Sequence, residues 1–162
     1  MARMSESEEK TRARHNNGKK DVIVFTNGVF DLLHPGHIKL LQFAKSLGGK
    51  LVVGLNSDRS TALLKGPTRP IQNEYDRKRA LENLSFVDEV VVFDEMRTTD
   101  IIRSVGPQVV VKGAEYTLQS VRKTDKIPST IKVVIFPIVN DAFGKKLSTT
   151  SIIEKMKKEA KE

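Results

Sequence analysis

The sequence of 162 residues contains no cysteine and no tryptophan, and only 6% of its residues are aromatic. The absence of cysteine excludes a disulfide scaffold, a Cys-based zinc site, an iron–sulfur cluster and a cysteine nucleophile. No apolar run approaches the roughly 20 residues that a membrane-spanning helix needs. The first 20 residues also lack the apolar stretch of a secretory signal. We therefore expect a soluble, cytoplasmic protein that does not associate with membranes.

The charge is strongly of one sign: 28 Lys and Arg face 20 Asp and Glu, a formal net charge of +8 at pH 7. Such a chain suits nucleic acid, an anionic membrane or small phosphorylated ligands. Residues 1–20 hold six basic and three acidic side chains and are expected to form a disordered basic tail. Residues 21–162 are expected to form one domain. Because most aromatic residues lie within apolar runs, no platform for stacking nucleic-acid bases is indicated.

From residue 21 onward, short runs rich in Val and Ile alternate with helical patterns. Strands are expected within residues 21–25, 50–56, 87–93, 107–113 and 131–137. Helices are expected within residues 37–49, 73–86, 98–106 and 148–162, and a loop at 58–73. This alternation predicts a single α/β domain, Rossmann-like, with a parallel sheet of about five strands and helices on both faces.

The loop after the first predicted strand, GVFDLLHPGH (28–37), is the first candidate site. Ligands of open parallel sheets bind beyond the carboxyl ends of the strands. His34 and His37 lie at this edge, and Gly36 permits a close backbone approach. The predicted helix start adds free N–H groups and a positive dipole end, so the loop suits an anionic oxygen. A polar turn that merely caps the helix and a two-histidine metal site are the alternatives.

The motif of this loop resembles the signature G-x-F-D-x-x-H-x-G-H of the cytidylyltransferase-like nucleotidyltransferases. Its residues are Gly28, Phe30, Asp31, His34, Gly36 and His37. Two further elements are similar to that family. One is the run of Ser148, Thr149 and Thr150 at a predicted helix start, and the other is Arg77, which precedes the sequence VDEV at 87–90.

The segments 56–72 and 107–116 resemble more specifically the adenylyltransferase part of the bifunctional heptose-phosphate kinase/adenylyltransferase. The kinase part has no counterpart here, and Ala114, Glu115 and Lys146 depart from the pattern. The resemblance implies transfer of AMP from ATP to D-glycero-D-manno-heptose 1-phosphate, which gives ADP-heptose and pyrophosphate. Cytidylyl transfer to glycerol 3-phosphate or another polyol phosphate, and guanylyl transfer to a heptose phosphate, are alternatives. A nucleic-acid-binding or regulatory module is the alternative of a different class.

The resemblance also implies roles for individual residues. The catalytic set would be His34, His37, Lys65 and Arg77. Nucleotide contacts are expected from Thr26, Asn27, Gly28, Phe30, His34, Gly36, His37, Lys112, Gly113, Ser148, Thr149 and Thr150. Acceptor contacts are expected from Asp31, Asn56, Asp58, Lys65 and Arg69. Mg²⁺ would be held mainly by the nucleotide phosphates, with no metal ligand from the chain, and the protein would be a homodimer.

Several of these residues have a structural interpretation as well. Ser148 and its neighbours would cap a helix, Arg77 would pair with Glu74 on a helix surface, Asp58 would cap a helix, and Asp31 would bond its own turn. Between two prolines, Arg69 would lie on a loop that closes over the site as a lid. The basic side chains predicted around the cleft are Lys65, Arg69, Arg77, Lys112, Lys145 and Lys146.

Overall fold

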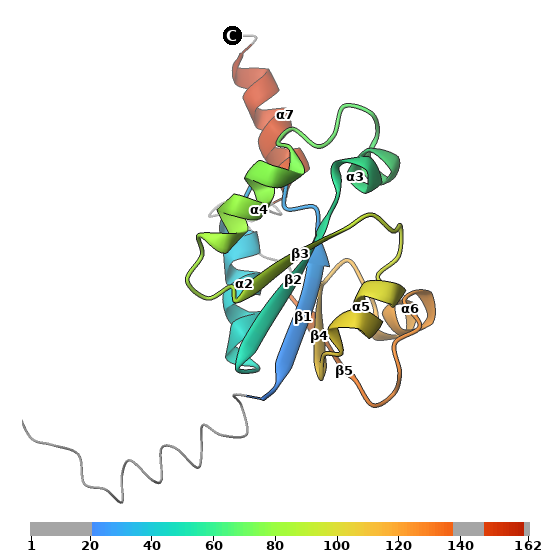
Figure 1. Ribbon diagram of the computed structural model, residues 1–162. Coiled ribbons are helices and arrows are strands. Elements are labelled where there is room, and N and C mark those ends of the chain that lie inside the picture. The colour runs from blue at the N-terminus through green and yellow to red at the C-terminus, as the bar shows by residue number, and fades with distance from the viewer. Residues whose placement is uncertain (1–20, 138–147, 161–162) are drawn as a thin grey trace, which may run out of the picture.

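Five parallel strands form one sheet in the computed structural model, which describes residues 21–137 and 148–160 (Figure 1). The strands are β1 (Ile23–Gly28), β2 (Lys50–Asn56), β3 (Glu89–Phe93), β4 (Val109–Gly113) and β5 (Lys132–Phe136). Their order across the sheet is β3-β2-β1-β4-β5. The predicted Rossmann-like fold is thereby confirmed. The predicted tail at 1–20, together with Lys145 and Lys146, lies outside the described residues.

Helices cover both faces of the sheet, as Figure 1 shows. The described helices are α2 (Pro35–Ser46), α3 (Asp58–Lys65), α4 (Glu74–Glu82), α5 (Thr99–Val105), α6 (Leu118–Thr124) and α7 (Thr149–Glu159). Leu41 of α2 and Leu81 of α4 pack on one face with Val24 and Leu51. On the other face, α5 and α6 pack against Phe25 and its neighbours. Among the described residues, none of these helices is long and apolar enough to cross a membrane.

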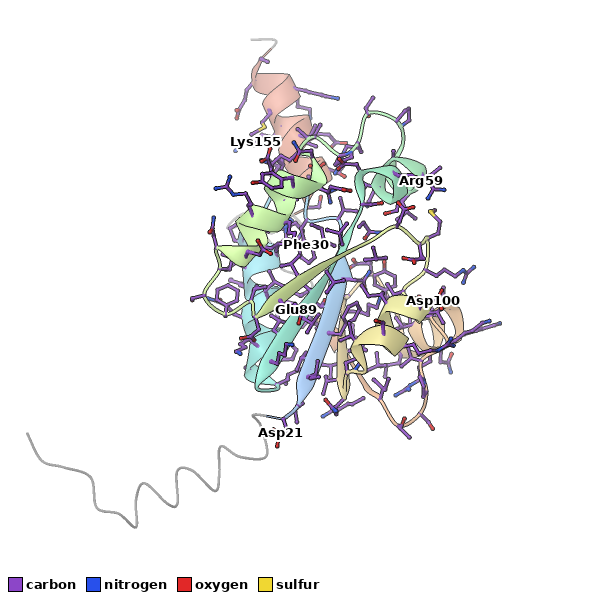
Figure 2. All side chains as sticks on the ribbon, in the orientation of Figure 1. Asp21, Phe30, Arg59, Glu89, Asp100 and Lys155 are labelled. Atoms are coloured by element: carbon purple, nitrogen blue, oxygen red, sulfur yellow. The ribbon has the colours of Figure 1, made fainter. Side chains whose placement is uncertain are left out.

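Two helices were not expected from the sequence. The segment 58–73, predicted as a loop, begins with α3, and α6 follows β4 where no element was assigned. The buried side chains of α3 are Ser60 and Thr61, whereas Leu63 and Leu64 are exposed. The usual apolar periodicity is therefore absent, and the side-chain cap from Ser57 to the Ser60 N–H is the main local signal. Arg59 on α3 and Lys155 on α7 extend into solvent (Figure 2).

The order of the strands reverses at β1, which pairs with β2 on one side and β4 on the other. Pairing with β2 continues to Gly28, but pairing with β4 ends at Phe25 and Val110. Beyond that point the Thr26 hydroxyl donates to the Val111 carbonyl oxygen at 2.9 Å. The carboxyl ends of β1 and β4 thus separate and open a crevice, which is where sheets of this class bind ligands.

Candidate active site

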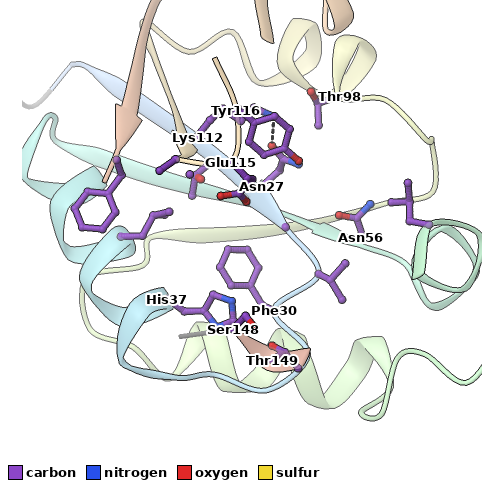
Figure 3. A pocket seen from close by; sticks show the side chains of 18 of the residues that line it. Asn27, Phe30, His37, Asn56, Thr98, Lys112, Glu115, Tyr116, Ser148 and Thr149 are labelled. Carbon is purple, nitrogen blue, oxygen red and sulfur yellow. Dashed lines mark hydrogen bonds between the residues drawn. The ribbon is translucent and has the colours of Figure 1, made fainter. Parts of the chain in front are cut away.

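A cleft of about 850 Å³ lies in this crevice (Figure 3). Two predicted site residues, Asp58 and Arg77, do not line it. The other predicted residues do: Thr26, Asn27, Gly28, Phe30, Asp31, His34, Gly36, His37, Asn56, Lys65, Arg69, Lys112, Gly113, Ser148, Thr149 and Thr150. The topology therefore brings together residues that are up to 124 positions apart in the sequence.

The side chain of His34 is the N-cap of α2. Its Nδ1 accepts hydrogen bonds from the backbone N–H groups of Gly36 at 3.1 Å and His37 at 3.4 Å. A ring nitrogen that accepts carries no proton, so the neutral imidazole has its proton on Nε2. The cap thereby fixes the tautomer and leaves Nε2–H as the donor. The structural alternative, a capping turn, and a role as a hydrogen-bond donor are thus compatible.

The two imidazole rings stack, with their centroids 3.7 Å apart and their planes at 24°. Burial lowers the pKa of His37 to about 3, assisted by repulsion from His34 and opposed by the Leu32 carbonyl. Burial also lowers the pKa of His34. Both rings are accordingly neutral hydrogen-bonding groups at neutral pH, which disfavours a role as charged phosphate clamps.

The turn that delivers the histidines is shaped by Phe30. This residue adopts the left-handed conformation, with φ of 47°, although it is not glycine, a state that costs about 1–3 kcal/mol. Its side chain is buried and its ring lies 5.1 Å from the ring of His37. A Cβ at Gly28 would lie 3.0 Å from that ring. Gly28 therefore leaves room for the Phe30 ring, which lies next to the ring of His37 (Figure 3).

The N-terminus of α7 borders the same cleft. Ser148 and Ser151 form a capping box, in which each side chain accepts from the other residue's backbone N–H. The Thr149 hydroxyl donates to the Leu32 carbonyl oxygen at 3.3 Å, which ties α7 to the loop of the histidines. Two helices, α2 and α7, consequently direct their N-termini into one cleft. Such ends favour anionic groups.

A buried ammonium group lies across the cleft at the end of β4. Lys112 Nζ donates to the Asn27 side-chain oxygen and pairs with the Asp125 carboxylate at 3.2 Å. Its side chain is only 4% exposed. Burial lowers the pKa of Lys112, while Asp125 and Glu115 act in the opposite direction. Lys112 therefore continues the link between β1 and β4 and still borders the cleft.

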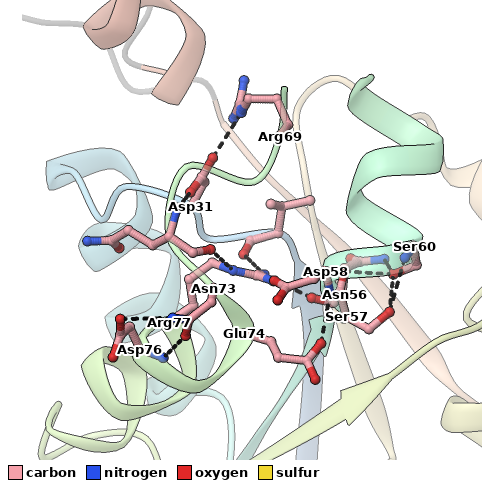
Figure 4. Close-up of polar contacts among 12 residues, drawn as sticks. Asp31, Asn56, Ser57, Asp58, Ser60, Arg69, Asn73, Glu74, Asp76 and Arg77 are labelled. Carbon is pink, nitrogen blue, oxygen red and sulfur yellow. Dashed lines mark hydrogen bonds and ion pairs between the residues drawn. The ribbon is translucent and has the colours of Figure 1, made fainter. Parts of the chain in front are cut away.

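Arg77 lies outside the cleft, so the expectation that it contacts phosphate does not match its position (Figure 4). It is fully buried, and its guanidinium donates to the carbonyl oxygens of Val29, Asn56 and Gln72. It also pairs with Asp58 at 2.8 Å. The alternative expected from sequence was a surface pair with Glu74 or another nearby acid; Arg77 pairs with Asp58, but from a buried position, and Glu74 accepts from the Asp58 N–H. Arg77 joins the ends of β1 and β2 to the start of α4.

The Asp31 carboxylate faces the segment 66–72 rather than its own turn. It accepts from the Ile71 and Gln72 backbone N–H groups and from Arg69 Nε, all within 3.0 Å. Burial would raise the pKa of Asp31, but these donors outweigh it, so the pKa lies below its usual value. Asp58 likewise bonds to Arg77 at the start of α3, where Ser57 is the cap.

Several lining residues were not anticipated from the sequence. Met96, Arg97 and Thr98 follow β3, and Thr124 and Asp125 lie at the end of α6. The first group lies just beyond the carboxyl end of a strand, so the rule applied to the other strands could have found it. No local pattern marks the second group, because it reaches the cleft only through the docking of α6.

The described residues contain no cluster of three or more His, Asp or Glu side chains that could hold a metal ion. Mg²⁺ prefers oxygen ligands and keeps several waters. Of the carboxylates that border the cleft, Asp31 and Asp125 are already engaged by cationic partners. This donor set fits an ion carried in by substrate phosphates better than one held by the chain.

The fold and the cleft place the protein among the α/β nucleotide-binding proteins of Rossmann type. The cytidylyltransferase-like family model matches residues 25–155. The bifunctional protein HldE of Gluconobacter oxydans is 47% identical over 143 residues, which is 88% of this chain and 28% of that protein. The chain belongs to the cytidylyltransferase-like family, and it spans less than a third of the length of that HldE protein.

Solved structures agree with this fold. The lipopolysaccharide core biosynthesis protein of Thermoplasma volcanium is 31% identical, with a TM-score of 0.58 over 73% of this chain and 96% of that one. Pantothenate synthetase of Thermus thermophilus, at 17% identity, shares the fold with a TM-score of 0.62 over 82% of this chain and 62% of that one.

Proposed function

We propose that the protein transfers a nucleoside monophosphate from a nucleoside triphosphate to a sugar phosphate, with ATP and heptose 1-phosphate as the substrates that fit its relatives. The observation that carries this proposal is the convergence of His34, His37 and the N-termini of α2 and α7 on one cleft. The similarity to HldE proteins over most of the chain supports the heptose acceptor. The product would be ADP-heptose.

In the proposed reaction, an oxygen of the acceptor phosphate attacks the α-phosphorus of the triphosphate. The bond from that phosphorus to the bridging oxygen breaks, and pyrophosphate leaves. The step needs no covalent intermediate, so the protein contributes by positioning two polyanions and by stabilising charge on the phosphoryl oxygens. Mg²⁺ bound to the triphosphate would neutralise part of that charge.

The His34 Nε2–H is the donor best prepared for the α-phosphate. Its tautomer is set by the α2 cap, and its lowered pKa keeps the ring neutral. Because the donor is already oriented, it needs no reorganisation in the transition state. His37 stacks on His34 and borders the same space. His34 acts as an oriented donor and not as a nucleophile, whereas the single N–H of the neutral His37 ring is used by the Leu32 carbonyl, so His37 supports the ring of His34.

The N-terminus of α7 and the side chains of Lys65 and Arg69 would receive the remaining phosphates. All three border the cleft. At the other end, the buried Lys112 and the backbone of Gly113 would face the nucleoside, and the Glu115 carboxylate occupies the space where Gly113 lacks a side chain. The acidic partners of Lys112 keep this end less positive than the phosphate end, which orients the nucleotide.

Pyrophosphate release tests the proposal directly. ATP, CTP and GTP are each combined with heptose 1-phosphate, heptose 7-phosphate or glycerol 3-phosphate. We expect ATP with heptose 1-phosphate to give the highest kcat/KM. If pyrophosphate were released only with CTP and glycerol 3-phosphate, the proposed substrates would be wrong but the proposed reaction type would stand. No release with any pair, together with DNA binding that weakens steeply with salt, would favour the nucleic-acid-binding alternative.

His34→Asn separates chemistry from folding. Asparagine is a good N-cap, so α2 stays capped, but the Nε2–H donor is lost. We expect kcat to fall about 100- to 1,000-fold, as for removal of an oxyanion-hole donor. Asn73→Ala is the matched control, because it removes the side-chain cap of α4, none of whose residues lines the cleft, and it should leave kcat within about twofold. Equal activity of His34→Asn and the wild type would remove His34 from the mechanism.

A further inference from the structure

The Asp31 carboxylate is completely committed to one neighbouring segment. Its side chain is 1% exposed. One oxygen accepts from the Gln72 N–H at 2.9 Å, the other from Arg69 Nε at 2.9 Å, and both lie within 3.0 Å of the Ile71 N–H. These bonds span 38 to 41 residues of sequence. A carboxylate used in this way has little capacity left for a metal ion or an acceptor hydroxyl.

The segment 66–72 is held from a second side by Arg77. The Gln72 carbonyl oxygen accepts from Arg77 Nε, and the Val29 carbonyl oxygen accepts from Arg77 Nη1. Asp31 therefore binds the N–H side of this segment and Arg77 its carbonyl side (Figure 4). The segment is fixed against the loop that carries the histidines, rather than being a freely moving lid.

Arg69 is presented to the cleft by this arrangement. Only its Nε atom bonds to Asp31, and within residues 21–137 and 148–160 its two Nη atoms have no hydrogen-bond partner. The side chain is 13% exposed and borders the cleft. The two Nη atoms form the edge of a guanidinium that can bind a phosphate through parallel hydrogen bonds.

The surroundings of Arg69 suit a phosphate group. Asp31 is adjacent in sequence to Leu32, whose carbonyl oxygen accepts from Thr149 at the start of α7. The N-terminus of α7 and the side chain of Lys65 border the same cleft as Arg69. An arginine, a lysine and the N-terminus of an eleven-residue helix thus face one space, and Asp31 itself is shielded by its partners.

We propose that Asp31 is a positioning residue that aims the Nη edge of Arg69 at a substrate phosphate. The phosphate belongs either to the β,γ end of the triphosphate or to the acceptor. The inference rests on the proposed function for the identity of these substrates. Asp31 acts only through Arg69 and the segment 66–72, so the effect of changing Asp31 should disappear when Arg69 has no guanidinium.

A double-mutant cycle tests this dependence. Asp31→Asn, Arg69→Ala and the double variant are compared in KM for each substrate, in kcat, and in the affinity for inorganic pyrophosphate measured by calorimetry. We expect Arg69→Ala to weaken phosphate binding by about 10- to 100-fold and Asp31→Asn by about tenfold. The double variant should match Arg69→Ala alone, because both changes remove the same interaction.

The separate Michaelis constants identify the phosphate. A rise confined to KM of the triphosphate, with weaker pyrophosphate binding, assigns Arg69 to the β,γ end. A rise confined to KM of the sugar phosphate, with unchanged pyrophosphate binding, assigns it to the acceptor. Losses that multiply in the double variant would overturn the inference, because Asp31 would then act independently of Arg69.

Arg69→Lys provides a second test that leaves Asp31 bonded to the Ile71 and Gln72 N–H groups. Lysine keeps the charge but loses both the two Nη donors and the Nε bond. We therefore expect Arg69→Lys to raise KM, on a logarithmic scale, at least half as much as Arg69→Ala does. Arg69→Lys with the wild-type KM values would contradict the inference, even if Asp31→Asn failed to fold. Arg103→Lys on exposed α5 is the matched control and should change neither constant.

The outcome is separable from that of the proposed function. If the wild type released no pyrophosphate with any substrate pair, the proposed function would fail, whereas calorimetric cycles with inorganic pyrophosphate and with heptose 1-phosphate would still report on Arg69 and Asp31 at either phosphate. If the wild type were active and Arg69→Ala had no effect on any constant, only the positioning role would fail.

Discussion

The two flanks of β1 each contain a buried cation, and the two cations are satisfied differently. On the β2 side, Arg77 donates four hydrogen bonds, three of them to backbone carbonyl oxygens. On the β4 side, Lys112 contacts Asn27 and Asp125 and also borders the cleft. Both are at most 4% exposed. Arg77 thus serves the fold, whereas Lys112 is placed where a ligand can use it.

His34 and His37 resemble Lys112 rather than Arg77, because they also line the cleft. Burial lowers the pKa of His34, His37 and Lys112, which means that the fold disfavours their charged forms. Arg77 differs from them, because its charge is compensated by oriented carbonyl oxygens. One flank therefore stabilises the protein, and the cleft wall carries polar groups at some expense of stability, as is common at functional sites.

The largest expected effect is the loss of Arg77. Arg77→Met leaves three buried carbonyl oxygens and Asp58 without their partner, so we expect the free energy of unfolding to fall by about 3–5 kcal/mol. Urea denaturation followed by circular dichroism measures this. Arg79→Met on the same helix is the control, because Arg79 is exposed and contacts only the Tyr75 ring; its cost should stay below about 1 kcal/mol. A stable Arg77→Met variant with a raised KM would instead place Arg77 among the ligand-binding residues.

The next effect concerns the pH dependence of stability. The pKa of His37 is about 3 in the folded state against 6.5 for the free side chain. The unfolded chain therefore gains a proton below pH 6.5 that the folded protein does not bind, so this contribution to stability is complete above pH 6.5 and is lost as the pH falls toward 3. Between pH 7 and pH 5 the loss amounts to about 2 kcal/mol.

His37→Asn removes the titrating group and should flatten this dependence. The variant and the wild type are compared by urea denaturation at pH 7, 6 and 5. We expect the wild type to lose about 2 kcal/mol more than the variant over this range. Parallel slopes for the two proteins would show that His37 is protonated in the fold, and would then favour charged imidazoles in the reaction.

The sheet was predictable because its strands are buried on both faces and read as continuous apolar runs. Leu51 to Leu55 and Val109 to Val111 of the inner strands are examples. By contrast, α3 buries Ser60 and Thr61 and exposes Leu63. Ser60 bonds to Ser57 and Asn56, whereas the buried Thr61 hydroxyl has no hydrogen-bond partner in the part of the chain that the structure describes. A hydrophobicity pattern cannot detect a helix whose buried side chains are polar.

The position of most predicted site residues also followed from the sequence, because motifs at strand ends converge by topology. What the sequence could not show is how each polar group is partnered. Arg77, Asp58 and Asp31 belong to the same motifs as the histidines, yet their bonds go to protein atoms. A motif predicts where a residue lies in the structure. Whether its side chain faces the ligand or bonds to other protein atoms depends on hydrogen bonds to residues 19 to 48 positions away in the sequence.

The smallest effect on stability is expected at Lys112. Lys112→Met combined with Asp125→Asn replaces both charges, so the cost of burying them and their attraction are removed together. We expect the free energy of unfolding to change by about 1 kcal/mol or less, while KM for the triphosphate rises at least about tenfold. Lys112→Met alone should be less stable than the double variant, because Asp125 keeps a buried and unpaired charge. If the double variant is instead destabilised as strongly as Arg77→Met with an unchanged KM, then Lys112 is a second structural cation and the contrast between the two flanks of β1 does not hold.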